Sequence, residues 1–97
     1  MCGIAGYIGF RNAQNVVLNS LKNLEYRGYD SWGIASLNNG QATVVKEVGP
    51  ISTAPLSLLK DSKSHIAISH TRWATHGGVS KKNAHPHLSP NKKIIVV

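Results

Sequence analysis

A single cysteine stands at the second position of the chain, where its thiol could act as a nucleophile. Initiator methionine is generally removed when a small side chain follows, and loss of Met1 would give Cys2 a free α-amine. An α-amine ordinarily has a pKa of about 8 and a thiol one of about 8.5, so such an amine can accept the thiol proton near neutral pH. Gly3 is expected to leave room for a substrate. The alternative is a buried, unreactive thiol at the start of a strand.

A second group of chemistry-bearing side chains lies in the segment HTRWATHGG, residues 70–78. The guanidinium of Arg72 suits bidentate binding of a carboxylate. Thr75 and His76 could add hydrogen bonds to the same anion, and Trp73 could cover it. This pattern predicts a site for an anion or a carboxylate. The alternative is a structural junction between strand and loop, with Trp73 packed in the core.

The chain contains four histidines that could gather in space, namely His70, His76, His85 and His87. A zinc site needs three or four convergent ligands at close spacing, and here the histidines are accompanied by one cysteine and no nearby carboxylate. We therefore expect no bound metal. A single cysteine also excludes an internal disulfide framework.

The net charge of +7 on the 97 residues is concentrated at one end of the sequence. Residues 62–97 hold six lysines and arginines and no acidic residue. Such a segment could bind nucleic acid or another anion, or it could be a solvated loop whose acidic neighbours lie elsewhere. The pairs Lys81-Lys82 and Lys92-Lys93 are not interleaved with aromatic side chains, which argues against nucleic acid. A small basic nucleic-acid-binding module is the alternative function, and its binding would weaken steeply with salt.

The hydrophobic pattern predicts a small α+β domain with helices packed on a sheet. Asn12 is a suitable cap for a helix whose apolar residues recur at helical spacing up to Leu24, and Gly28 is expected as the left-handed residue after it. Asn39-Gly40 predicts a hairpin turn. We expect strands at 3–9 (buried), 33–37, 42–48, 66–71 and 93–97, a second short helix at 53–60 and a long loop at 72–91.

The two ends of the sequence carry no targeting pattern. The first residues lack the basic and apolar regions of a secretory signal, and no apolar stretch approaches the roughly 18 residues of a membrane span. We therefore expect a cytoplasmic protein that does not associate with membranes. The apolar run at 93–97 ends on its last residue, which suggests that more chain follows.

Four segments of the sequence together resemble the class II glutamine amidotransferases. They are MCGIAG at 1–6, LEYRGYDS at 24–31, HTRWATHG at 70–77 and NAHPH at 83–87. The second and third favour the branch of the glutamine–fructose-6-phosphate aminotransferases (isomerizing), also called glucosamine-6-phosphate synthases. The resemblance covers essentially all 97 residues. Trp32 is a minor departure, because that branch often has a small residue after the Asp-Ser pair.

The resemblance implies an N-terminal-nucleophile hydrolase fold, an αββα sandwich that residues 1–97 would form only in part. It also implies hydrolysis of the side-chain amide of L-glutamine. Cys2 would attack that amide with its own amine as the base, form a thioester and release ammonia. Arg72, with Thr75 and His76, would bind the α-carboxylate of the substrate.

Further roles follow from the same resemblance. Trp73 matches the aromatic residue that closes over the site and gates ammonia, while His85 and Arg27 match positions that line or support it. No cofactor is implied. In the longer enzymes, which are expected to be homo-oligomers, C-terminal sugar isomerase domains use the ammonia to convert fructose 6-phosphate. These domains are absent from residues 1–97.

The resemblance also implies groups that the 97 residues lack. An Asn-Gly pair that supplies the oxyanion hole would follow Val97, and an acidic residue for the α-amine of glutamine would come later. Loss of one oxyanion donor lowers the rate by a factor on the order of 10²–10³. We therefore expect the isolated chain to have negligible glutaminase activity.

Overall fold

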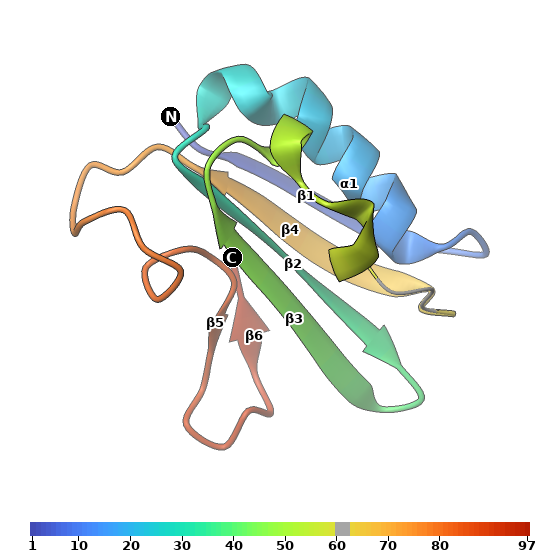
Figure 1. Ribbon diagram of the computed structural model, residues 1–97. Helices are drawn as coiled ribbons and strands as arrows, with labels where there is room; N and C mark the ends of the chain where they lie inside the picture. Colours follow the sequence, from blue (N-terminus) through green and yellow to red (C-terminus); the bar gives the residue numbers. More distant parts are fainter. Residues whose placement is uncertain (60–62) are drawn as a thin grey trace.

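The computed structural model describes residues 1–59 and 63–97 and shows an antiparallel sheet with an α-helix across one face (Figure 1). The α+β class expected from the sequence is confirmed. The sheet has the order β1-β4-β2-β3, and β5 and β6 form a separate two-stranded ladder. The elements are β1 (Gly3–Ile8), α1 (Ala13–Leu24), β2 (Ser31–Asn38), β3 (Gln41–Val48), β4 (Ile66–Arg72), β5 (His87–Leu88) and β6 (Ile95–Val96).

Helix α1 begins where the sequence predicts. The side chain of Asn12 accepts a hydrogen bond from the backbone N–H of Asn15 at 3.1 Å, which satisfies one of the free donors of the first turn. Val17 and Leu21 are fully buried on the helix face that meets the sheet, where they pack with Trp32 of β2. The large side chain of Trp32, the departure noted in the sequence, therefore belongs to the hydrophobic core.

Strands β2 and β3 form the predicted hairpin. Asn38 pairs with Gln41, and the two residues between them, Asn39 and Gly40, have φ values of 50° and 76°. A two-residue turn with two positive φ angles matches the twist of antiparallel strands. This turn fixes the register of β2, and so determines which of its side chains face α1.

Two expectations about the connections are wrong. Gly28 has an extended backbone with φ −172°, because a 3₁₀ turn at Glu25–Arg27 follows α1 and the chain then straightens. The region expected as a second helix forms two 3₁₀ turns, Ile51–Thr53 and Leu56–Leu58, and residue 60 of the expected span lies outside the described residues. The proline between the two turns restricts Ala54 to the extended conformation, which interrupts the helix.

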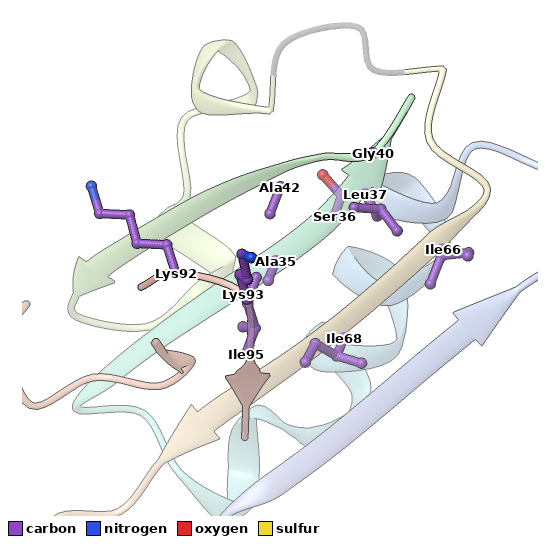
Figure 2. A pocket seen from close by; sticks show the side chains of 10 residues that line it. All are labelled: Ala35, Ser36, Leu37, Gly40, Ala42, Ile66, Ile68, Lys92, Lys93 and Ile95. Carbon is purple, nitrogen blue, oxygen red and sulfur yellow. The ribbon is translucent and has the colours of Figure 1, made fainter. Parts of the chain in front are cut away.

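The face of the sheet opposite α1 is only partly covered. Along β1 the side chains alternate, and Ile4 and Ile8 are exposed, so the expectation that this strand is buried is wrong. A groove of about 420 Å³ lies between this face and the β5–β6 segment, with Ile68 and Ile95 on its apolar side and Lys92 and Lys93 at its rim (Figure 2). Among the described residues, no helix is long and apolar enough to span a bilayer.

Candidate active site

The pairing of β1 with β4 brings the two chemistry-bearing segments together. Gly3 pairs with Thr71, so the residue before β1 lies beside the residues that follow β4. The Sγ atom of Cys2 accepts a hydrogen bond from the backbone N–H of Trp73 at 3.5 Å and lies 3.9 Å from its carbonyl oxygen. Cys2 is exposed, so the alternative of a buried thiol is wrong. The thiol and the segment with the predicted carboxylate site therefore form one site.

Two glycines allow the backbone segments around this site to approach one another. A β-carbon on Gly28 would lie 2.6 Å from the carbonyl carbon of Arg72, and only a glycine permits that contact. A β-carbon on Gly3 would lie 2.8 Å from the β-carbon of Leu24 and from the hydroxyl of Thr71. The expectation that Gly3 leaves room for a substrate is therefore wrong, because the helix end and β4 fill that space.

Asp30 is a residue of the site that the sequence analysis did not select. One carboxylate oxygen accepts a hydrogen bond from the backbone N–H of Ala74, and the other accepts one from the hydroxyl of Ser31 at 2.8 Å. The backbone N–H of Asp30 donates to the carbonyl oxygen of Arg72 at 3.2 Å. Its place in the segment LEYRGYDS was the only indication in the sequence, because a single aspartate in a loop has no distinctive spacing.

Arg72 is the last residue of β4 and is largely buried. Its guanidinium donates hydrogen bonds to three successive carbonyl oxygens, those of His76, Gly77 and Gly78, with the last at 3.2 Å. The loop after β4 is therefore folded back around the guanidinium. The side chains of Thr75 and His76 are exposed on this loop, and their expected contacts with an anion stay a prediction.

Trp73 and Tyr29 form an exposed aromatic pair after β4 and before β2. Trp73 is 45% exposed and contacts the edge of Tyr29, with ring centroids 5.5 Å apart, so the alternative that it packs in the core is wrong. Both rings line a hollow of about 170 Å³ that also includes Val79. Arg27 donates a hydrogen bond from Nε to the carbonyl oxygen of Cys2 at 3.2 Å, which agrees with the supporting position implied for it.

Three of the four histidines gather on the sheet face opposite α1, where His70 and His85 are stacked and His87 meets His85 edge-on. The ring centroids of His70 and His85 are 4.1 Å apart with the rings nearly parallel, and the ring centroids of His85 and His87 are 4.4 Å apart. Burial lowers the pKa of His70 to about 4, with a further contribution from the neighbouring His85 and Arg72, and burial also lowers the pKa of His85. The ring of His85 packs against the ring of His70 on this face of the sheet. In the parts of the chain that the structure describes, no cluster of His, Cys, Asp or Glu has the geometry for a metal ion.

Comparison with known proteins matches residues 13–93 to the family model of the class-II glutamine amidotransferases. The chain is 56% identical over 88 residues to the glutamine–fructose-6-phosphate aminotransferase (isomerizing) of Chlamydia muridarum, covering 91% of the chain and 14% of that protein. It is 52% identical over 97 residues to the enzyme of the same name from Chlamydia trachomatis, covering all of the chain and 16% of the relative. The enzyme of that name from Listeria innocua is 50% identical over 97 residues, with the same coverage.

The thiol of Cys2, the end of β4 and the loop that follows it lie together at one end of the antiparallel sheet. The chain belongs to the class-II glutamine amidotransferase family. Over its whole length it is similar to the amidotransferase region of glutamine–fructose-6-phosphate aminotransferases, and it spans about one sixth of the length of these relatives.

Proposed function

We propose that this chain carries the nucleophile and the carboxylate-binding arginine of a glutaminase that releases ammonia from L-glutamine. The observation that carries the proposal is the contact between the thiol of Cys2 and the backbone of Trp73, next to Arg72. A nucleophile in contact with the backbone of the residue that follows a largely buried arginine suits an amino acid substrate whose carboxylate is held while its side chain reacts.

The proposed reaction begins after removal of Met1. The α-amine of Cys2 accepts the thiol proton, and the sulfur attacks the side-chain carbonyl carbon of glutamine. The carbon–nitrogen bond breaks, the leaving group takes a proton and departs as ammonia, and a thioester joins the glutamyl group to Cys2. Water then hydrolyses the thioester, which gives glutamate and restores the thiol. Arg72, with Thr75 and His76, binds the α-carboxylate, Trp73 covers the substrate, and His85 supports the site.

The finer features of the fold and pathway are part of the same proposal. The exposed apolar side chains on the sheet face opposite α1 support an αββα sandwich of N-terminal-nucleophile hydrolase type, in which a second sheet covers this face. In a longer protein the ammonia would serve glucosamine 6-phosphate synthesis from fructose 6-phosphate. The names of the relatives, which specify glutamine and fructose 6-phosphate, support this part of the proposal. The 97 residues span about one sixth of the length of these relatives, and we expect them by themselves to form part of a domain with negligible glutaminase turnover.

The test uses 6-diazo-5-oxo-L-norleucine, an electrophilic analogue of glutamine, and intact-mass spectrometry. It compares the 97-residue chain with a chimaera in which Val97 is followed by the corresponding sequence of the Chlamydia trachomatis relative. We expect loss of Met1 and one adduct on Cys2 in the chimaera, no adduct in the variant Cys2→Ala, and little adduct in the 97-residue chain. Retention of Met1 in a chimaera that forms the adduct would contradict the proposed base. Rapid hydrolysis of glutamine by the 97-residue chain would contradict the proposal that it forms only part of the domain.

A further inference from the structure

We infer that Asp30 is a positioning residue, which fixes the backbone of Trp73 against the thiol of Cys2. The inference rests on the proposed function in so far as that thiol is the nucleophile. It assigns Asp30 no contact with the substrate, and its action passes through the two peptide groups on either side of Trp73.

The contacts of Asp30 bracket Trp73 on both sides. The backbone N–H of Asp30 donates to the carbonyl oxygen of Arg72, and its carboxylate accepts from the backbone N–H of Ala74. One residue therefore holds the peptide groups before and after Trp73. The backbone N–H of Trp73, which belongs to the first of these two peptide groups, donates to the sulfur of Cys2 at 3.5 Å.

Asp30 is itself held in place. The hydroxyl of Ser31, a fully buried residue, donates to its second carboxylate oxygen at 2.8 Å. The backbone N–H of Gly49 donates to its carbonyl oxygen at 2.8 Å. The close approach at Gly28 brings this loop against the end of β4. Ser31 of β2 thus orients the carboxylate of Asp30, and Gly49, the residue after β3, holds its backbone.

The role requires a hydrogen-bond acceptor rather than a charge. The Trp73 amide is a hydrogen-bond donor to the sulfur of Cys2, and Asp30 keeps this donor in place beside the attacking atom. In the variant Asp30→Asn, the amide oxygen can still accept from Ala74 while the amide NH₂ donates to the hydroxyl of Ser31. In Asp30→Ala both contacts are lost.

The test measures the rate at which iodoacetamide alkylates the thiol of the folded 97-residue chain at pH 7. We expect Asp30→Ala to react about threefold more slowly than the parent chain or slower still, because the loosened Trp73 amide no longer donates a hydrogen bond to the sulfur. Asp30→Asn should recover most of the parental rate. A parental rate in a folded Asp30→Ala variant would overturn the inference, and so would an Asp30→Asn variant as slow as Asp30→Ala.

Glu25 provides a matched control. Its carboxylate also accepts from one backbone N–H and one hydroxyl, both of Ser52, at 2.7 and 3.1 Å. Glu25→Ala should leave the alkylation rate unchanged, and an equal slowing would overturn the inference by showing a general loss of stability. If Asp30→Ala does not fold, Ser31→Ala removes the donor that orients the carboxylate. Slower alkylation of this variant supports the inference, and a parental rate overturns it.

Iodoacetamide lacks the α-amine and α-carboxylate of glutamine, so the outcome does not depend on the proposed binding of that carboxylate by Arg72. A chimaera that forms no adduct with the glutamine analogue, together with a slow Asp30→Ala variant, would contradict the proposed function alone. An adduct on the chimaera with no effect of Asp30→Ala would contradict the positioning role alone.

Discussion

The carbonyl oxygen of His85 lies over Gly33, in the space that a side chain would occupy. A β-carbon on Gly33 would be 2.0 Å from this oxygen and 2.9 Å from Cδ of Pro86. Lys46 holds the same segment from β3 by donating to the carbonyl oxygen of Ala84 at 2.8 Å. The segment that carries His85 is therefore seated directly on the backbone of β2.

The first prediction concerns this contact. Gly33→Ala should lower the free energy of unfolding by about 1–3 kcal/mol or more, because a side chain at this position must displace a backbone carbonyl. Chemical denaturation measures the loss. Gly6→Ala is the control, since its β-carbon would meet other atoms only at ordinary distances of 3.8 Å. Equal stability of the two variants would contradict the close packing at Gly33.

The elements with a strong local pattern were predictable from the sequence. The helix start at Asn12 and the turn at Asn39-Gly40 depend on hydrogen bonds and φ angles within a few residues, and both are confirmed. Pro55, in contrast, ends the 3₁₀ turn before it, and the apolar residues at 53–60 alone do not reveal this.

The sequence indicates the candidate residues Cys2 and Arg72, but it does not indicate the residues that hold them in place. Cys2 and Arg72 stand out by residue type and position. The contribution of Asp30 depends on the register Ser31↔Arg72 between β2 and β4, which brings two segments more than 40 residues apart side by side. The need for glycine at position 28 arises from the same approach, so a local interpretation as a helix end was wrong.

The second prediction concerns a buried polar pair between α1 and β2. The side-chain amide of Gln14 donates to the hydroxyl of Ser36 at 2.8 Å, and both residues are buried. Ser36→Ala should lower the free energy of unfolding by about 1–3 kcal/mol, because it leaves the amide without this acceptor. The double variant Gln14→Leu with Ser36→Ala should recover part of the loss in denaturant titrations. If the changes in free energy of unfolding caused by Gln14→Leu and Ser36→Ala simply add in the double variant, the pairing is contradicted.

The third prediction concerns the loop after β4. Arg72→Lys should speed the cleavage of the loop at residues 76–78 by subtilisin, because an ammonium cannot reproduce the fork of a guanidinium that donates to three carbonyl oxygens. The expected loss of stability is about 1–3 kcal/mol. Arg11→Lys is the control, as Arg11 is exposed and lies over the ring of Tyr7. An unchanged cleavage rate in Arg72→Lys would show that other contacts hold the loop.

The fourth prediction is a loss of stability in mild acid that originates at His70. Burial, with the nearby His85 and Arg72, lowers its pKa to about 4 in the folded chain, whereas the ordinary value is 6.5. Between these values the unfolded chain binds more protons, so stability is highest above pH 6.5 and falls as the pH approaches 4. The slope for one such group is at most about 1.4 kcal/mol per pH unit.

Thermal melts of His70→Gln and of the parent chain between pH 7 and pH 4.5 test this prediction. The melting temperature of the parent should fall more steeply with pH than that of His70→Gln, which cannot take up a proton. Some dependence on pH should persist in the variant, because burial also lowers the pKa of His85. The exposed His65 supplies the control, and His65→Gln should follow the parent. Parallel pH profiles for the parent and His70→Gln would show that protonation of His70 is not linked to unfolding.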